Sequence, residues 1–165
     1  MAITPDLIAV LRAKFRLDWD GIHGARHWAR VRRNGLRLAR STGANPAVVE
    51  YFAFLHDSCR YSDDEDPRHG PRAAVFAESL RAGHIALSDE QFGELRDAIA
   101  GHTHGVDHPS ITVRTCWDAD RLDLTRIGID PDPELLFTEP AKQAALKHLL
   151  QPRVRRRALW SDIRL

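Results

Sequence analysis

Histidines beside carboxylates are the most distinctive chemical feature of this sequence. The chain holds nine histidines among 165 residues, and His56 directly precedes Asp57 at the end of the apolar run FAFL. Burying an imidazole next to a carboxylate is costly unless both are paired or coordinated. Clustered His and Asp side chains are typical of metal sites, whereas a single such pair is more often a core histidine bonded to a backbone carbonyl.

Two further segments favour the metal interpretation. In HGARHWARV, His27 shares the inward face of a predicted helix with Val31, and in TCWDADRLDL, Asp120 shares a face with Trp117. Three separate helices would therefore each direct a ligand towards the core. One divalent cation would satisfy two imidazoles and two carboxylates and keep positions for water.

The chain resembles the HD superfamily of metal-dependent phosphohydrolases. The resemblance rests on HGARHWARV, FLHDSCR, DPRHGPRAA, GHTHG and CWDADRLDL, in this order over roughly residues 20–127. The superfamily pattern is a His, a His-Asp pair and a distant Asp, which fall here on His27, His56-Asp57 and Asp120. The resemblance implies an all-α fold, a compact HD-domain bundle of about six to eight helices. The synthetase-like and cyclic-dinucleotide branches of the superfamily are not expected, because the chain is too short for an added catalytic domain and no GYP signature follows the pair.

The resemblance also selects between neighbouring candidates. The superfamily's last ligand directly precedes a basic residue, which favours Asp120 over Asp118; Asp118 would then orient a histidine or face solvent. The two are about 200° apart on a helix, so both cannot face the core. The first ligand precedes an Arg-Val pair, which favours His27 over His23, expected near the mouth of the site.

Further residues are expected around the metal. Asp57 would ligate it and also orient or deprotonate a water. His69 is a candidate catalytic residue, since related enzymes often place groups that protonate the leaving group or touch phosphate in the loop after the His-Asp pair, and His102, at the end of a predicted helix, is a second candidate. Candidate phosphate-binding residues are Arg26, Arg60, Arg72 and Arg121. The expected cofactor is one divalent ion (Mn, Fe, Ni, Co, Zn or Mg), and a second could be held by His84, His102 or His104.

The leading hypothesis is therefore a phosphohydrolase that acts on a nucleotide or another small phosphorylated metabolite through a metal-activated water. The alternatives are an HD-type diiron oxygenase, which needs additional His ligands, and a non-catalytic metal- or nucleotide-binding module. A structural zinc site is disfavoured because such sites prefer cysteine ligands.

Composition limits the other function classes. The net charge is +1, so no overall field favours nucleic acid or anionic lipid. Cys59 and Cys116 are too few for a disulfide framework and are expected to be buried thiols. No segment looks like a signal peptide or a membrane span, so a cytoplasmic location is expected. The expected partner is a small phosphorylated substrate, and a homodimer is left open.

The sequence pattern predicts that helices position these residues. The first starts at Thr4-Pro5-Asp6, and others cover about 24–42, 46–59, 72–82, 89–102, 111–124 and 141–150. We expect residues 60–71 to form a polar loop and residues 128–140 to be mostly irregular, with few or no strands in the chain. We expect a single domain over 1–165, with its core at about 20–127 and a C-terminal helix and arginine-rich tail at 141–165.

Overall fold

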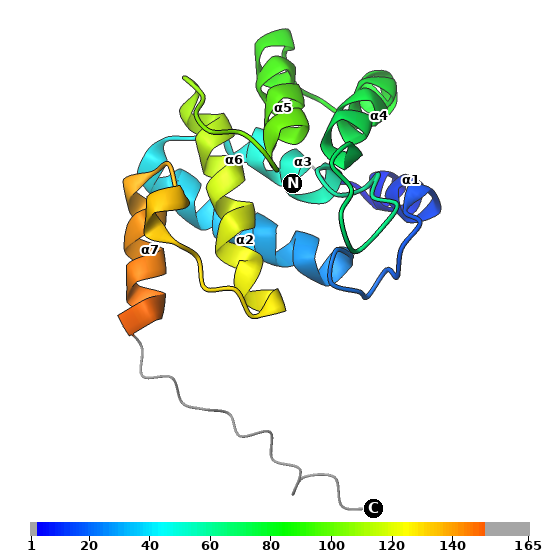
Figure 1. Cartoon of the computed structure of the whole chain (residues 1–165). Helices are drawn as coiled ribbons and strands as arrows, with labels where there is room; N and C mark the ends of the chain where they lie inside the picture. The colour runs from blue at the N-terminus through cyan, green and yellow to red at the C-terminus, as the bar shows by residue number, and fades with distance from the viewer. Residues whose placement is uncertain (1–2, 151–165) are drawn as a thin grey trace, which may run out of the picture.

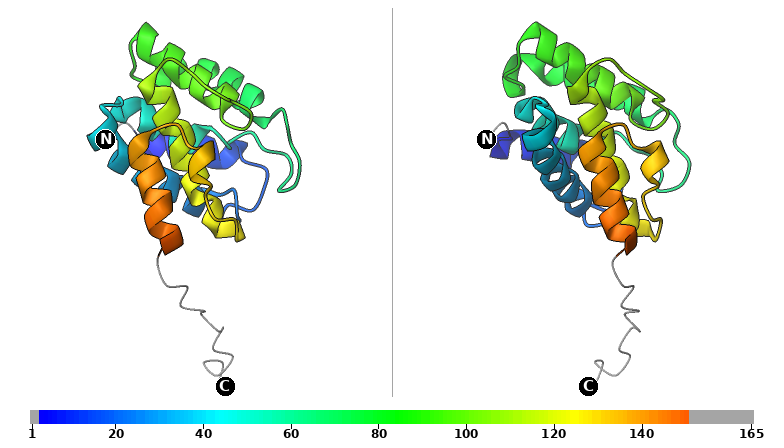
Figure 2. Two further views of the ribbon diagram at one scale, coloured as in Figure 1. Left: turned by 60° about the vertical axis from the view of Figure 1, so that its left-hand side comes forward. Right: turned by 90° about the vertical axis from the view of Figure 1, so that its left-hand side faces the viewer.

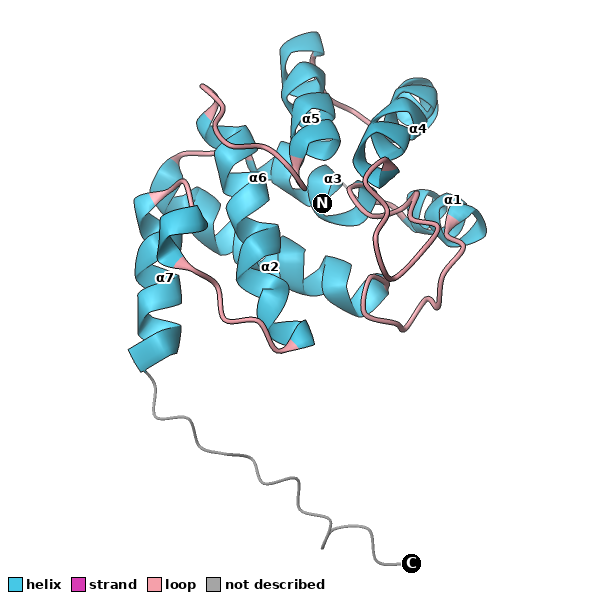
Figure 3. Ribbon diagram, viewed as in Figure 1, coloured by secondary structure: helices cyan, strands magenta, loops and turns pink. Residues whose placement is uncertain are grey.

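The computed structural model describes residues 3–150, which form a bundle of seven α-helices without a strand (Figure 3). This confirms the predicted fold class; the arginine-rich tail lies outside the described residues. The helices are α1 (Pro5–Lys14), α2 (Ala25–Thr42), α3 (Pro46–Leu55), α4 (His69–His84), α5 (Asp89–Gly101), α6 (Ile111–Arg121) and α7 (Glu139–Leu150). Two 3-10 helices, η1 (Leu122–Ile127) and η2 (Pro133–Leu135), connect α6 to α7.

Capping side chains define several helix starts. Thr4 Oγ1 accepts a hydrogen bond from the backbone N–H of Leu7, and Pro5 follows as the first helical residue. Asn45 caps α3 ahead of Pro46 in the same way, and Ser88 forms the predicted capping box with Gln91. These caps satisfy backbone donors that have no partner within the first turn.

Helix α2 lies at the centre of the bundle, packed against α3 and α6, while α4 and α5 pair with one another (Figure 1). Figure 2 shows α7 beside α2 and α6, away from the α4–α5 pair. Gly43, which ends α2, adopts a φ of 78°, the left-handed conformation that favours glycine after a helix. The motifs that contain His27, Asp120 and the His56-Asp57 pair therefore lie on α2, on α6 and at the end of α3, and these three helices contact one another.

Three predicted helix boundaries are wrong. Helix α3 stops at Leu55 rather than Cys59, so His56 and Asp57 lie at its end and in the following turn. Helix α4 begins at His69 instead of residue 72, because Pro71 in a first turn sacrifices no helical hydrogen bond. Helix α6 ends at Arg121, after which the chain tightens into η1.

The buried apolar side chains of the described residues form one core cluster. Cys59 and Cys116 belong to it as free thiols, as expected, and burial raises the pKa of both. Within residues 3–150, no helix combines the length and apolar character that crossing a bilayer requires.

Candidate metal centre

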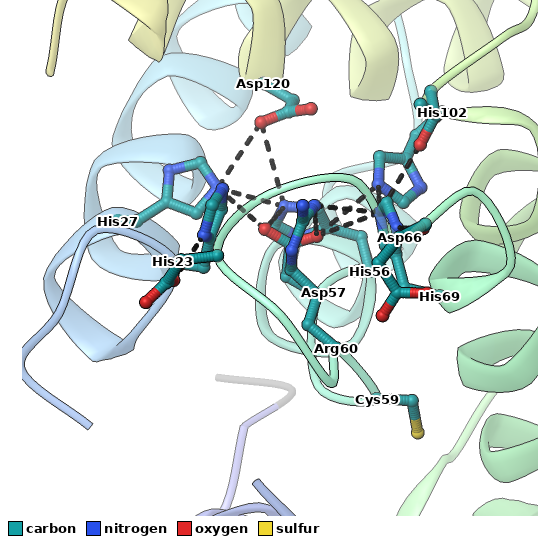
Figure 4. A network of polar contacts seen from close by, with 12 residues as sticks. His23, His27, His56, Asp57, Cys59, Arg60, Asp66, His69, His102 and Asp120 are labelled. Atoms are coloured by element: carbon teal, nitrogen blue, oxygen red, sulfur yellow. Dashed lines mark hydrogen bonds and ion pairs between the residues drawn. The ribbon is translucent and has the colours of Figure 1, made fainter. Parts of the chain in front are cut away.

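Four side-chain atoms from three parts of the bundle converge in its interior (Figure 4). His27 Nε2 from α2 lies 3.1 Å from His56 Nε2 at the end of α3. Asp57 Oδ2 lies 3.6 Å from both of these nitrogens, and Asp120 Oδ1 from α6 lies 3.3 Å from His27 Nε2 and 3.7 Å from His56 Nε2. The four residues singled out in the sequence as candidate ligands therefore lie around the His27–His56 pair, with a carboxylate oxygen of Asp57 and of Asp120 each within 3.7 Å of both Nε2 atoms.

The tautomers of the two imidazoles follow from their other nitrogens. His56 Nδ1 lies 3.2 Å from the carbonyl oxygen of Phe52, and a carbonyl can only accept, so Nδ1 carries the proton. His27 Nδ1 donates to Asp123 Oδ2 at 2.7 Å. In the neutral rings both Nε2 atoms then carry lone pairs that face one another, an unfavourable contact unless a cation or a proton lies between them.

A second histidine pair faces the other oxygen of Asp57. His69 Nε2 and His102 Nε2 lie 2.7 Å apart, and Asp57 Oδ1 is 3.2 Å from the first and 3.5 Å from the second. Their Nδ1 atoms donate to backbone carbonyls, His102 to Ile99 at 2.8 Å and His69 to Asp66 at 2.5 Å. Asp57 therefore lies between two pairs of imidazole lone pairs, with one oxygen directed at each.

The second pair depends on a close approach of two helices. Gly70 follows His69 at the start of α4, and a Cβ atom there would lie 2.7 Å from the carbonyl oxygen of Ile99 at the end of α5. Any side chain would push the helices apart. Glycine at this position therefore brings His69 and His102 together.

The electrostatics of the cluster reflect its burial. Burial lowers the pKa of His56 to about 3. Burial also acts to lower the pKa of His27 and His102, but the neighbouring carboxylates, chiefly Asp120 for His27 and Asp57 for His102, outweigh it and raise both values. Burial opposes ionisation of Asp57, yet the surrounding imidazoles hold its pKa well below the ordinary range. The cluster therefore favours ionised carboxylates next to the positively charged forms of His27 and His102.

These residues fit a divalent metal ion. Ligand atoms at about 2.1 Å from one ion are roughly 3.0–3.4 Å from each other, and the donor separations around the His27–His56 pair run from 3.1 to 3.7 Å. Three ligand groups within 4.8 Å can be drawn from the cluster: His27, His56 and Asp57; His56, His102 and Asp120; Asp57, His69 and His102. Imidazole and carboxylate donors suit first-row divalent metals.

Arg60 is the predicted arginine that reaches the cluster. Its Nη1 lies 3.4 Å from Asp57 Oδ1 and 3.3 Å from His69 Nε2, and carbonyls of the following loop hold the rest of the guanidinium. Thr103 Oγ1 lies 3.3 Å from His69 Nε2. Asp120 keeps a fifth of its side chain exposed, at 20%, so the centre reaches solvent on that side.

The other predicted arginines have different partners. Arg26 is 75% exposed and lies 3.7 Å from Asp20. Arg72 binds the carbonyl of Cys59 and the carboxylate of Asp66. Arg121 donates to the carbonyls of Leu135 and Gly105, so it ties two loops together.

Some of the remaining histidine candidates join the cluster and others do not. Of the three considered for a second ion, only His102 joins the cluster; His104 is exposed, and His84 lies at the far end of α4. His23 lies in the turn before α2 and bonds to Asp63 at 2.7 Å. Its ring meets that of His27 edge-on at 6.4 Å.

Asp118 does not orient a histidine, and it does not face solvent. It is fully buried and accepts hydrogen bonds from the N–H groups of Phe137 and Thr138 and from the Thr138 hydroxyl. The carboxylate that does orient a histidine of the cluster is Asp123, which accepts from His27 Nδ1 and was not among the residues expected from the sequence. Its position three residues after Asp120, one helical turn further on, is a signal that could have identified it.

Comparison with known proteins supports the same fold. No family model matches the chain, and no curated protein matches it. Among solved structures, it is similar to the crystal structure of a predicted HD superfamily hydrolase from an uncultured Thermotogales bacterium. That likeness has a TM-score of 0.69 and 24% sequence identity, and covers 87% of this chain and 83% of the other. The arrangement of helices is therefore that of an HD domain.

Proposed function

We propose that this HD-domain protein is a metal-dependent phosphohydrolase that acts on a nucleotide or another small phosphorylated metabolite. The observation that carries the proposal is the placement of Asp57 and Asp120 beside the facing His27 and His56 Nε2 atoms, whose lone pairs are directed at one another. The similarity to a predicted HD superfamily hydrolase agrees with it.

The metal would be held by these four residues, and it would supply a water of lowered pKa and Lewis-acid polarisation of a phosphoryl oxygen. The residues of the chain have separate tasks. Asp123 fixes the tautomer and ring orientation of His27. Asp57 accepts a proton from the attacking water or orients it. Arg60, with its guanidinium beside Asp57 Oδ1, binds an oxygen of the phosphoryl group and offsets its developing charge.

His69 and His102 would hold a second ion together with Asp57, or would donate a proton to the leaving group in its absence. Arg60 faces the same two acceptors, His69 Nε2 and Asp57 Oδ1, as this second ion would. Occupancy of the second position therefore requires the guanidinium to share or leave these atoms.

The test is a phosphatase screen over nucleotides and sugar phosphates, with each candidate metal added back to chelated protein. We expect hydrolysis that depends on metal and is lost in His56→Ala and Asp57→Ala. His104→Ala is the matched control, since His104 is an exposed histidine outside the cluster, and it should retain activity. Hydrolysis that survives loss of both His56 and Asp57 would disprove the proposal.

A second candidate, a diiron oxygenase, is favoured by one observation: the additional histidine ligands that it requires are present as His69 and His102. Arg60 beside them argues for phosphate instead. Assays with iron and with manganese, each with and without oxygen, separate the two functions. A hydrolase works with manganese under anaerobic conditions, whereas an oxygenase requires both iron and oxygen.

A further inference from the structure

A cavity of about 680 Å³ lies between α2, the turn that precedes it, η1 and α7. Four arginines line it: Arg26, Arg30, Arg33 and Arg126. We propose that this arginine cavity binds a phosphate-bearing small molecule, at a site separate from the metal centre. Its volume is in the range of roughly 300–1,000 Å³ typical of small-molecule sites.

Three of the arginines form one stripe. Arg26, Arg30 and Arg33 follow at intervals of four and three residues along α2, so they project from one face of the helix. Arg126 faces them from η1. Its side chain is only 9% exposed, and its Nε and Nη1 atoms donate to the carbonyls of Ile22 and Asp123 at 2.9 and 3.2 Å, which fixes the guanidinium in place.

The charge of the cavity favours a dianion. Its lining carboxylates are Asp20 and Asp123. Asp20 is 68% exposed at the rim, 3.7 Å from Arg26, and both oxygens of Asp123 are already engaged. Four guanidinium groups against two carboxylates leave two positive charges. Guanidinium groups bind phosphate oxygens in pairs, so a phosphate monoester or a pyrophosphate group matches both the charge and the donors.

Asp123 separates this cavity from the metal centre. Its Oδ1 accepts from Arg30 Nε at 2.7 Å on the cavity side, and its Oδ2 accepts from His27 Nδ1 at 2.7 Å. His27 Nε2, on the opposite edge of the ring, faces His56 and Asp120. A ligand held by the arginines therefore lies behind His27, so this cavity is distinct from the substrate position of the proposed hydrolase.

The experiment is calorimetric titration of the full-length protein, freed of metal by chelation, with inorganic pyrophosphate at fixed ionic strength. We expect saturable binding of one equivalent. Arg33→Glu should weaken it at least tenfold, and Arg26→Glu combined with Arg33→Glu should abolish it, because both side chains are exposed and their replacement leaves the core intact.

Three controls test whether binding is specific to the arginine cavity and to phosphate. Arg96→Glu changes an exposed arginine of α5 outside the cavity and should bind pyrophosphate like the wild type. His56→Ala should also bind normally, whatever its activity, so failure of the proposed hydrolase does not affect this test. Succinate, a dianion without phosphate, should bind at least tenfold more weakly than pyrophosphate.

Absence of saturable binding in the wild type would overturn the proposal. An equal loss in Arg33→Glu and Arg96→Glu would reduce the effect to general charge attraction, and a loss in His56→Ala would assign the binding to the metal centre. Succinate binding as tightly as pyrophosphate would contradict the phosphate specificity.

Discussion

Asp123 forms a hydrogen bond with the edge of the His27 ring that faces away from the other candidate ligands: its Oδ2 lies 2.7 Å from His27 Nδ1, although the two residues are 96 positions apart in the sequence. The contact leaves the lone pair of His27 Nε2 directed at the other ligand atoms. Arg30 engages the second carboxylate oxygen at 2.7 Å, so the orienting group is itself fixed. Histidine ligands of metals commonly rely on such a carboxylate, which sets the tautomer and raises the basicity of the ring.

Asp123→Asn should therefore weaken metal binding without unfolding the protein. The amide keeps the shape of the side chain but loses its charge, and we expect a decrease of about 10–100-fold in Mn²⁺ affinity, measured by calorimetry. Asp97→Asn, which alters an exposed carboxylate of α5, is the matched control and should leave affinity unchanged. Wild-type affinity in Asp123→Asn would show that the contact has no orienting role.

Gly70→Ala should destabilise the protein and disturb the His69–His102 pair. The added Cβ would lie 2.7 Å from the Ile99 carbonyl oxygen, which belongs to helix backbone and cannot easily move. We expect a loss of about 1–3 kcal/mol in the free energy of unfolding, measured with urea.

Gly93→Ala provides the contrast for Gly70→Ala. It lies within α5, and a Cβ there meets nothing within 4 Å. The substitution should raise the free energy of unfolding by about 0.5–1 kcal/mol, because alanine has a higher helix propensity than glycine. Equal effects of the two substitutions would mean that the α4–α5 approach is not tight.

Asp118→Ala should affect stability and leave the metal centre intact. The substitution removes the acceptor for two backbone N–H groups and the Thr138 hydroxyl. We expect a loss of about 2 kcal/mol from unsatisfied buried donors, visible as a lower melting temperature at unchanged Mn²⁺ affinity. A tenfold loss of affinity would instead assign Asp118 a role in positioning the metal ligands.

Metal affinity should fall as the pH is lowered. Coordination requires neutral imidazoles, and carboxylate contacts raise the pKa of His27 and His102 above the ordinary value of 6.5 despite their burial. Binding therefore displaces protons, and each displaced proton weakens affinity about tenfold per pH unit below the raised pKa values. Calorimetry from pH 8 to pH 5.5 measures this slope. Affinity independent of pH would exclude proton displacement at these histidines.

The sequence predicted the parts of the fold that local signals determine. Thr4-Pro5, Asn45-Pro46 and the Ser88 capping box each mark a helix start through contacts within a few residues. The gathering of His27, His56 and Asp120 in the interior was also predictable, because helical periodicity placed them on inward faces, and Asp57 follows directly from its position next to His56. The start of α4 was misjudged since Gly70 and Pro71 look like loop residues, although a first helical turn tolerates both.

Several contacts that the sequence did not predict are long-range. The pairing of His69 with His102 depends on how α4 crosses α5, and the partners of Arg121 lie in η2 and in the loop before α6. Asp118 was misplaced because its acceptor role requires the turn at Phe137 and Thr138 to return to α6. Such contacts follow from tertiary packing, which helical periodicity does not specify.

The central claim is that one ion binds where His27, His56, Asp57 and Asp120 meet. The most direct measurement is an anomalous-scattering map from crystals grown with Mn²⁺. We predict a peak within about 2.0–2.3 Å of His27 Nε2, His56 Nε2, Asp57 Oδ2 and Asp120 Oδ1. A map without a peak at this position under saturating Mn²⁺, or with the ion bound by other residues, would contradict the claim.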